Sequence, residues 1–181
     1  MTEINQPKSY MKFLNSNSRM SFVLLAALSL IASGCVSPPV PWNLRVTKAT
    51  PASVDVDIVG VQPDDKAQLM SMKVDDWWAS PPNDVTRKGY REIMLTTNFQ
   101  GGTNWIVSKD DPIWSKWLGP GGLGVKEIMV IANLPRVRED PPRRKFLPLT
   151  VNDWINPVNQ SIEIRVQDDR IWVVTGQQVK K

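Results

Sequence analysis

The chain has 181 residues, 22 of them basic and 18 acidic, so its formal net charge is +4. It contains no histidine and a single cysteine, which excludes imidazole catalysis, imidazole metal sites and a disulfide within the chain. This length is typical of one folded domain with its own core.

The first 34 residues form a predicted secretory signal peptide. Residues 22–32 are nearly all apolar, and three basic residues precede them. This run is too short to span a bilayer, which needs about 20 residues, but it fits the apolar region of a cleaved signal. The small residues Ala32, Ser33 and Gly34 then lead directly to Cys35.

This arrangement resembles the lipobox of bacterial lipoproteins, in which the cysteine is acylated after the leader is removed. The alternative is an ordinary secretory signal followed by an incidental cysteine. The resemblance implies that Cys35 carries the lipid, and three acyl chains make an effectively permanent anchor. Val36 and Ser37 follow the cysteine, with no aspartate, which for this class of protein implies an outer-membrane anchor and a domain in the periplasm.

Residues 35–41 are a predicted tether between the acylated cysteine and a domain at 42–176. Three of them are proline, a composition that keeps a linker extended. Seven residues span at most about 25 Å, so the domain is expected close to the membrane. Residues 177–181 are expected to form a flexible tail. Without the leader, which holds three basic residues and one acidic residue, the chain is nearly neutral, and this argues against nucleic-acid binding.

The domain is predicted to be an all-β, antiparallel sandwich of about seven or eight strands with one or two short helical inserts. Val54, Val56 and Ile58 alternate with Asp55 and Asp57, as in a half-buried strand. Similar runs predict strands at 43–48, 53–61, 90–97, 104–108, 126–134, 145–151, 161–167 and 170–176. Short strands without a βαβ rhythm are typical of transthyretin-like or immunoglobulin-like sandwiches.

Four of these strands have a predicted place in the fold. The segment 126–134 is apolar on both faces and is expected to be a central strand. Pro148 cannot donate a ladder hydrogen bond, so the segment 145–151 is expected at an edge or at a bulge. The last two strands flank Asp168 and Asp169 and are expected to form a hairpin.

Two inserts carry pairs of tryptophans. The segment 108–122 predicts a short helix, with Asp111 as its cap, Pro112 at its first position and Gly119 at its end. Its Trp114 and Trp117 either plug one end of the sandwich or form an aromatic platform for a ligand.

The second insert, residues 62–89, is long for a connection inside a compact domain, and such connections are usually functional or mobile. Its Trp77 and Trp78 are adjacent in sequence. They cannot both face the core of a strand, so one of them is expected to be available to a partner.

No catalytic, cofactor or metal site is expected from the residue pattern. The acidic residues occur as adjacent pairs at 64–65, 75–76, 110–111 and 168–169, which suits turns and helix caps better than two opposed catalytic carboxylates. The segment 119–124 is rich in glycine but lacks the lysine of a phosphate-binding loop. The chain is therefore predicted not to be an enzyme.

A proline-rich basic segment covers residues 134–149 and contains Arg136, Arg138, Arg143 and Arg144. Three explanations stand: a solvated loop, attraction to anionic headgroups of the nearby membrane, or recognition of an acidic patch on a partner protein.

The order of parts resembles the lipoprotein subunit of type VI secretion membrane complexes. The resemblance rests on the lipobox, the short tether and the segments VKEIMVIANLP, RRKFLPLTVNDW and SIEIRVQDDRIWV. It implies a transthyretin-like sandwich that is anchored in the outer membrane and holds the periplasmic end of an inner-membrane partner. No binding residue of that family is carried over. The chain equally resembles small bacterial lipoproteins with a tryptophan-rich β domain.

Two functions follow from these observations. The first is a non-catalytic interaction or assembly subunit of an envelope complex, with Arg136, Arg138, Arg143 and Arg144 among its candidate contacts. The alternative is a carbohydrate-binding module in which sugar rings stack on exposed tryptophans; its candidates are Trp77, Trp78, Trp114 and Trp117.

Overall fold

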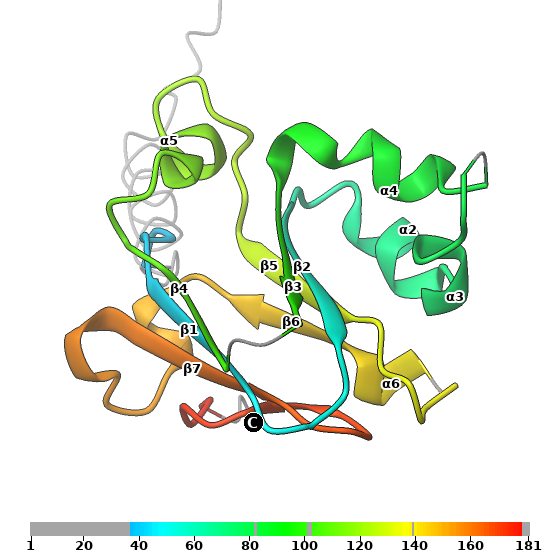
Figure 1. The fold of residues 1–181 in the computed structure, drawn as a ribbon. Coiled ribbons are helices and arrows are strands. Elements are labelled where there is room, and N and C mark those ends of the chain that lie inside the picture. Colours follow the sequence, from blue (N-terminus) through cyan, green and yellow to red (C-terminus); the bar gives the residue numbers. More distant parts are fainter. Residues whose placement is uncertain (1–36, 82, 101–102, 139, 179–181) are drawn as a thin grey trace, which may run out of the picture. The chain divides into compact units, whose positions relative to one another are not determined.

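The computed structural model describes residues 37–81, 83–100, 103–138 and 140–178, and its folded domain begins at Ser37. The predicted signal peptide and Cys35 lie outside the described residues. Two four-stranded sheets pack face to face, as Figure 1 shows. The prediction of an all-β sandwich is confirmed.

The first sheet has the strand order β4-β1-β7-β8. Its strands are β1 (Asn43–Lys48), β4 (Asn104–Val107), β7 (Ser161–Val166) and β8 (Ile171–Val173). β7 and β8 form the predicted hairpin. β1 pairs in parallel with β7, so that Leu44 lies opposite Ile162, and the sandwich is therefore mostly rather than wholly antiparallel.

The second sheet has the strand order β3-β2-β5-β6. Its strands are β2 (Val54–Val61), β3 (Met94–Phe99), β5 (Glu127–Ala132) and β6 (Arg144–Pro148). β5 is internal and β6 is at the edge, as predicted from the apolar pattern and from Pro148. The strand expected from residue 90 starts only at Met94, because the 3-10 helix η1 (Arg91–Ile93) precedes it.

Alternation along the strands fills the space between the sheets. Val56 and Ile58 of β2 and Ile162 and Ile164 of β7 are fully buried in one cluster. Fully burying one such side chain contributes about 1.5–3 kcal/mol, and this interior is the main source of stability in a domain without disulfides.

The long insert folds into three short helices that cover the outer face of the second sheet (Figure 1). They are α2 (Lys66–Ser71), α3 (Val74–Trp77) and α4 (Val85–Gly89). Leu69, Val74 and Trp77 pack on Met129 and Ile131 in a second buried cluster. This cover explains why β5 is apolar on both faces: neither face meets water.

The predicted helix in the other insert is α5 (Ile113–Leu118). The Asp111 carboxylate accepts a hydrogen bond from the Ile113 amide at 2.9 Å, and Gly119 follows the last turn. Pro112 is the cap position rather than the first helical residue, a shift of one residue that is ordinary at helix ends. The remaining short helices are α6 (Asp140–Arg143), η2 (Val151–Asp153) and η3 (Val158–Gln160).

Both ends of the predicted domain are longer than expected. In the tether, Pro39 bridges to Thr150 and the Val40 amide donates to the Leu149 carbonyl at 3.0 Å. In the tail, Gln177 bridges to Trp154. These segments satisfy backbone groups of the domain, so Ser37–Pro41 and Gln177–Gln178 belong to it rather than to a free tether and a free tail.

Candidate partner-binding surface

Three of the four candidate tryptophans are buried. Trp77 and Trp117 have no exposed surface, and Trp114 is almost completely enclosed. Trp114 and Trp117 meet edge to face with ring centroids 5.1 Å apart. Both extend from α5 into the core between the two sheets and fill one end of the sandwich. A stacking platform built from these residues is therefore wrong, because a sugar ring cannot reach their faces.

Gly60 allows Trp117 to enter this position. A Cβ atom at residue 60 would lie 2.5 Å from Trp117 Nε1, closer than real Cβ contacts permit. The indole nitrogen donates to the Ile93 carbonyl at 3.2 Å, so a hydrogen bond fixes the orientation of the ring in its apolar surroundings. The plug depends on the missing side chain at residue 60.

Trp78 is the half-buried member of the pair in the second insert. The Arg87 guanidinium lies over its ring, 4.7 Å from the centroid. Such cation–π stacking is favourable and occupies one face of the indole. The expected free tryptophan of this insert is thus committed to a contact within the domain.

Asp57 is the polar centre beneath the helical insert. Its carboxylate is fully buried and accepts hydrogen bonds from Trp77 Nε1 at 2.8 Å, Arg87 Nε at 2.8 Å and the Thr96 hydroxyl at 2.8 Å. The bond to Asp57 raises the pKa of Arg87. A carboxylate satisfied in this way joins β2, α3, α4 and β3, and it is a structural group.

Two of the four candidate arginines serve the fold. Arg143 is buried and pairs with Asp75 at 2.5 Å, while the Asp140 carboxylate accepts from the Val74 amide at 3.2 Å. Arg144 donates to the carbonyls of residues 69, 70 and 72 at the end of α2, and its burial lowers its pKa. Both arginines are thus engaged within the domain, where they fasten the insert to α6 and to the start of β6.

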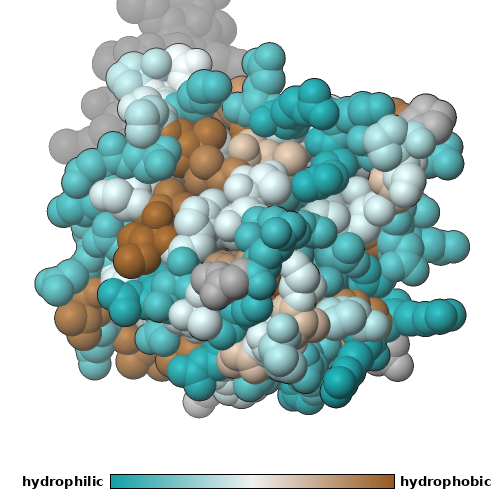
Figure 2. Space-filling view, viewed as in Figure 1, coloured by the Kyte–Doolittle hydropathy of each residue, from teal (hydrophilic) through white to brown (hydrophobic). Residues whose placement is uncertain are grey.

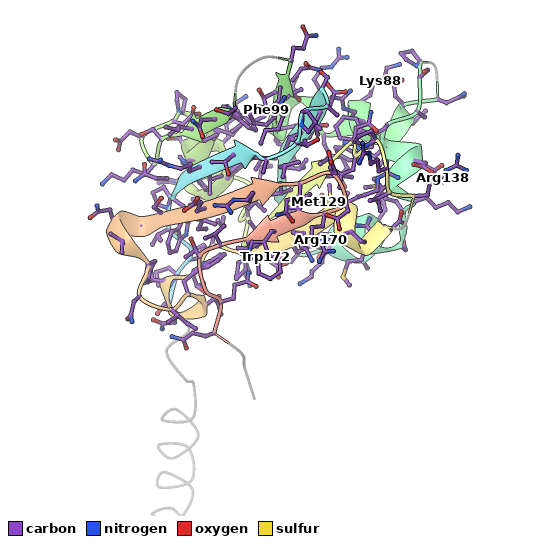
Figure 3. The ribbon with its side chains drawn as sticks, turned by 60° about the horizontal axis from the view of Figure 1, so that its bottom comes forward. Lys88, Phe99, Met129, Arg138, Arg170 and Trp172 are labelled. Carbon is purple, nitrogen blue, oxygen red and sulfur yellow. The ribbon has the colours of Figure 1, made fainter. Side chains whose placement is uncertain are left out.

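Arg136 and Arg138 are exposed, as a binding role requires. They line a groove of about 800 Å³ together with Lys145, Arg170 and Trp172. The groove lies between β6 and β8, which are the edge strands of their two sheets. Figure 3 shows Arg170 and Trp172 on the β8 side and Arg138 on the neighbouring turn. We call this surface the basic groove.

The basic groove is positive and carries an exposed aromatic ring. Its lining contains four basic side chains and one acidic side chain, Asp169. Arg170 pairs with Asp169 at 2.6 Å and lowers the pKa of that carboxyl. Arg136 makes a longer ion pair with Asp168, at 3.6 Å, and its side chain is 74% exposed. Trp172 is 54% exposed. Exposed aromatics and arginines are the residue types enriched at protein interfaces.

Sequence reasoning missed Arg170 and Trp172, although a local signal for Trp172 exists. Ile171 is buried, and alternation along β8 then points residue 172 to the outer face, opposite Arg165 of β7. What alternation does not indicate is that this hairpin lies beside the 134–142 turn. That neighbourhood depends on how the two sheets pack.

The described part of the chain offers neither a metal site nor a membrane-spanning helix. It holds no group of three or more acidic or cysteine side chains placed to bind a metal ion. No helix in it has the length and apolar character needed to cross a bilayer.

Comparison with known proteins gives structural likeness only. No protein-family model matches the chain, and no curated protein matches its sequence. A structure titled "Type VI membrane complex" is 16% identical with a TM-score of 0.49, over 77% of this chain and 99% of the other.

Two further structures are similar. Lip of Serratia marcescens, a membrane-bound component of the type VI secretion system, is 16% identical with a TM-score of 0.44, over 78% of this chain and 99% of its own. The type VI lipoprotein TssJ1 of Pseudomonas aeruginosa is 8% identical with a TM-score of 0.41, over 80% and 100%. These proteins belong to the type VI secretion machinery, as does the lipoprotein subunit that the sequence resembles in its order of parts. With such identities and scores, the role of this chain has to be argued from its own residues.

Proposed function

We propose that this protein is a lipid-anchored, non-catalytic subunit of a cell-envelope complex, of the kind found in type VI secretion membrane complexes. In this proposal Cys35 carries the anchor in the outer membrane, the domain lies in the periplasm, and the basic groove receives an acidic segment of a partner protein. The observation that carries the proposal is the groove itself, an exposed aromatic ring among unburied cations between two open sheet edges.

The position of the groove favours a protein partner over lipid headgroups. The tether joins the domain at Leu149 and Thr150, just after the end of β6, whereas Lys145 of the groove is at the start of β6. β7 likewise leads away from the tether end, and its length from Ser161 to Val166 is about 16 Å at the usual rise of a strand. The groove therefore lies at the end of the domain remote from the membrane anchor.

The ionisable groups inside the domain support a non-catalytic role. The buried carboxylate of Asp57 ties α3 and α4 to β2 and β3, and the buried guanidinium of Arg143 ties α6 to α3. Such groups stabilise one arrangement of the chain. The exposed charges, by contrast, gather in an open groove, where complementarity with a partner raises the association rate and the specificity.

The test is a site-specific photocrosslink in living cells. A photoreactive phenylalanine analogue replaces Trp172 in the groove, and a control replaces Val85, which is 71% exposed on α4. We expect a discrete adduct with one envelope protein from position 172 and none from position 85. Arg136→Glu combined with Arg138→Glu is expected to reduce the adduct about tenfold or more, since like charges then face the partner.

A matched charge reversal separates the groove from net charge. Lys109 and Lys126 are exposed and lie outside the groove, so Lys109→Glu combined with Lys126→Glu should leave the adduct unchanged. If both double variants reduce it equally, or if positions 172 and 85 give the same products, the groove is not the docking surface.

A further inference from the structure

Next to the tether, a short loop displays apolar side chains to the solvent. Residues 155–160, which we call the 155–160 loop, connect η2 to β7. Ile155 is 54% and Val158 is 75% exposed. Figure 2 shows hydrophobic residues at the left edge of the domain, over the loop that leads into β7 in Figure 1. The six residues of the loop are uncharged.

The backbone holds this loop in its exposed shape. Asn156, Asn159 and Gln160 have φ angles of 44°, 53° and 50°, in the left-handed region that non-glycine residues seldom occupy and that carries a strain cost. The Ile155 amide donates to the Gly176 carbonyl at 2.8 Å, and Asn43 Nδ2 donates to the Asn159 carbonyl at 3.2 Å. Bonds at both ends therefore maintain a conformation that places Val158 outward.

The same loop lies close in space to the tether that leads to Cys35, although the two are far apart in sequence. Asn152 Nδ2 donates to the Ser37 hydroxyl at 2.6 Å, which fixes the tether beside η2. Cys35 is two residues before Ser37, so their Cα atoms are at most about 7 Å apart. Ile155 is three residues after Asn152, a reach of about 10 Å. Apolar side chains are thus held within a short distance of an acylated residue.

The apolar surface continues beside the loop. Ile106 of β4 and Val174 after β8 are also exposed, and they line a shallow groove of about 640 Å³ with Ile155 and Val158, to which the strands add the charged side chains of Arg45 and Glu163. The strands here belong to the first sheet, and no helix of the described residues covers its outer face as α2, α3 and α4 cover that of the second sheet (Figure 1). A bilayer at the anchor would meet the end of this groove that Ile155 and Val158 form, whereas Trp172 of the basic groove lies opposite Arg165, toward the other end of β7.

From these observations we propose that the 155–160 loop inserts Ile155 and Val158 into the interfacial region of the membrane that holds Cys35. An uncharged loop with outward apolar side chains suits the boundary between headgroups and acyl chains, where apolar surface leaves water and polar groups stay hydrated. Insertion would give the domain one fixed orientation, with the basic groove turned away from the lipid. This inference rests on the lipid anchor of the proposed function.

The test measures the depth of residue 158 in vesicles. The acylated full chain carrying Val158→Cys is labelled with a nitrobenzoxadiazole fluorophore and reconstituted in phosphatidylethanolamine–phosphatidylglycerol vesicles. Acylation consumes Cys35, so the new cysteine is the only free thiol. Val85→Cys on α4 is the matched control, since the two valines are similarly exposed.

We expect the label at residue 158, and not the label at residue 85, to shift to shorter wavelength and to be quenched by lipids brominated near the headgroup. If the chain floats with the vesicles but both labels behave alike, the loop stays in water and the inference is wrong, while the anchor stands. A blue-shifted label without lipid quenching means that protein, a second copy or a partner, covers the loop, which also overturns the inference. If the chain does not float with vesicles, the anchor fails and the inference falls with it.

Discussion

Removing the Asp57 carboxylate tests whether this group fastens the helical insert to the second sheet. In Asp57→Ala, the indole N–H of Trp77 stays buried without its acceptor, and the Arg87 guanidinium loses its counter-charge. Breaking a buried ion pair by removing one partner costs about 3–5 kcal/mol. The Arg87 side chain is 30% exposed, so water replaces part of the lost interaction. We therefore expect a loss near the lower limit, about 3 kcal/mol.

The matched control is Asp55→Ala. Asp55 precedes Asp57 by one strand period and pairs with the exposed amide of Asn98. A partly exposed hydrogen bond of this kind is within reach of water, so its removal should change the free energy of unfolding by about 0.5 kcal/mol or less. The two variants remove the same group from the same strand and differ in burial.

Urea unfolding of the Cys35→Ser chain, followed by tryptophan fluorescence, measures both variants. If the insert detaches before the sandwich unfolds, Asp57→Ala should also lower the denaturant slope, because less surface is exposed in the main transition. A free-energy loss equal to that of Asp55→Ala, with an unchanged slope, would refute the reasoning: the buried carboxylate would then contribute nothing beyond an ordinary surface group.

Two further predictions concern the plug and the anchor. Gly60→Ala should destabilise the domain by about 1–3 kcal/mol, the usual cost of overpacking a core, because the new Cβ displaces the Trp117 indole. The control Gly89→Ala should be tolerated, because no atom lies within 4 Å of its new Cβ. Equal shifts of the melting temperature in the two variants would contradict this prediction. Cys35→Ser should move the protein from the membrane fraction to the soluble fraction of washed cells, and retention on the membrane would show that acylation is not the anchor.

Local pattern was enough to predict most strands and one helix of this fold. Alternation over 54–58 and 161–166 assigns the core-facing side chains, and Asp111, Pro112 and Gly119 delimit α5, since these signals act within a few residues. The one parallel pair, β1 with β7, was not predictable in this way, because alternation is the same for parallel and antiparallel partners.

The candidate site depended much more on tertiary structure. The tryptophans at 77, 114 and 117 were candidates for ligand binding and are buried instead, since sequence cannot say whether a large aromatic ring ends up in a core or on a surface. The insert folds back over the second sheet and buries Trp77. In the same arrangement Arg143 pairs with Asp75, and Arg144 donates to backbone carbonyls at the end of α2.

The sequence by itself determined the β character of the domain and predicts the leader with its terminal cysteine, because these depend on composition and on spacing between near neighbours. Only the tertiary structure decided which cations stay exposed. Arg136 and Arg138 meet Arg170 and Trp172 because the two sheets pack with β6 and β8 on the same side, and that packing is set by the shape of the whole core rather than by any local run of residues.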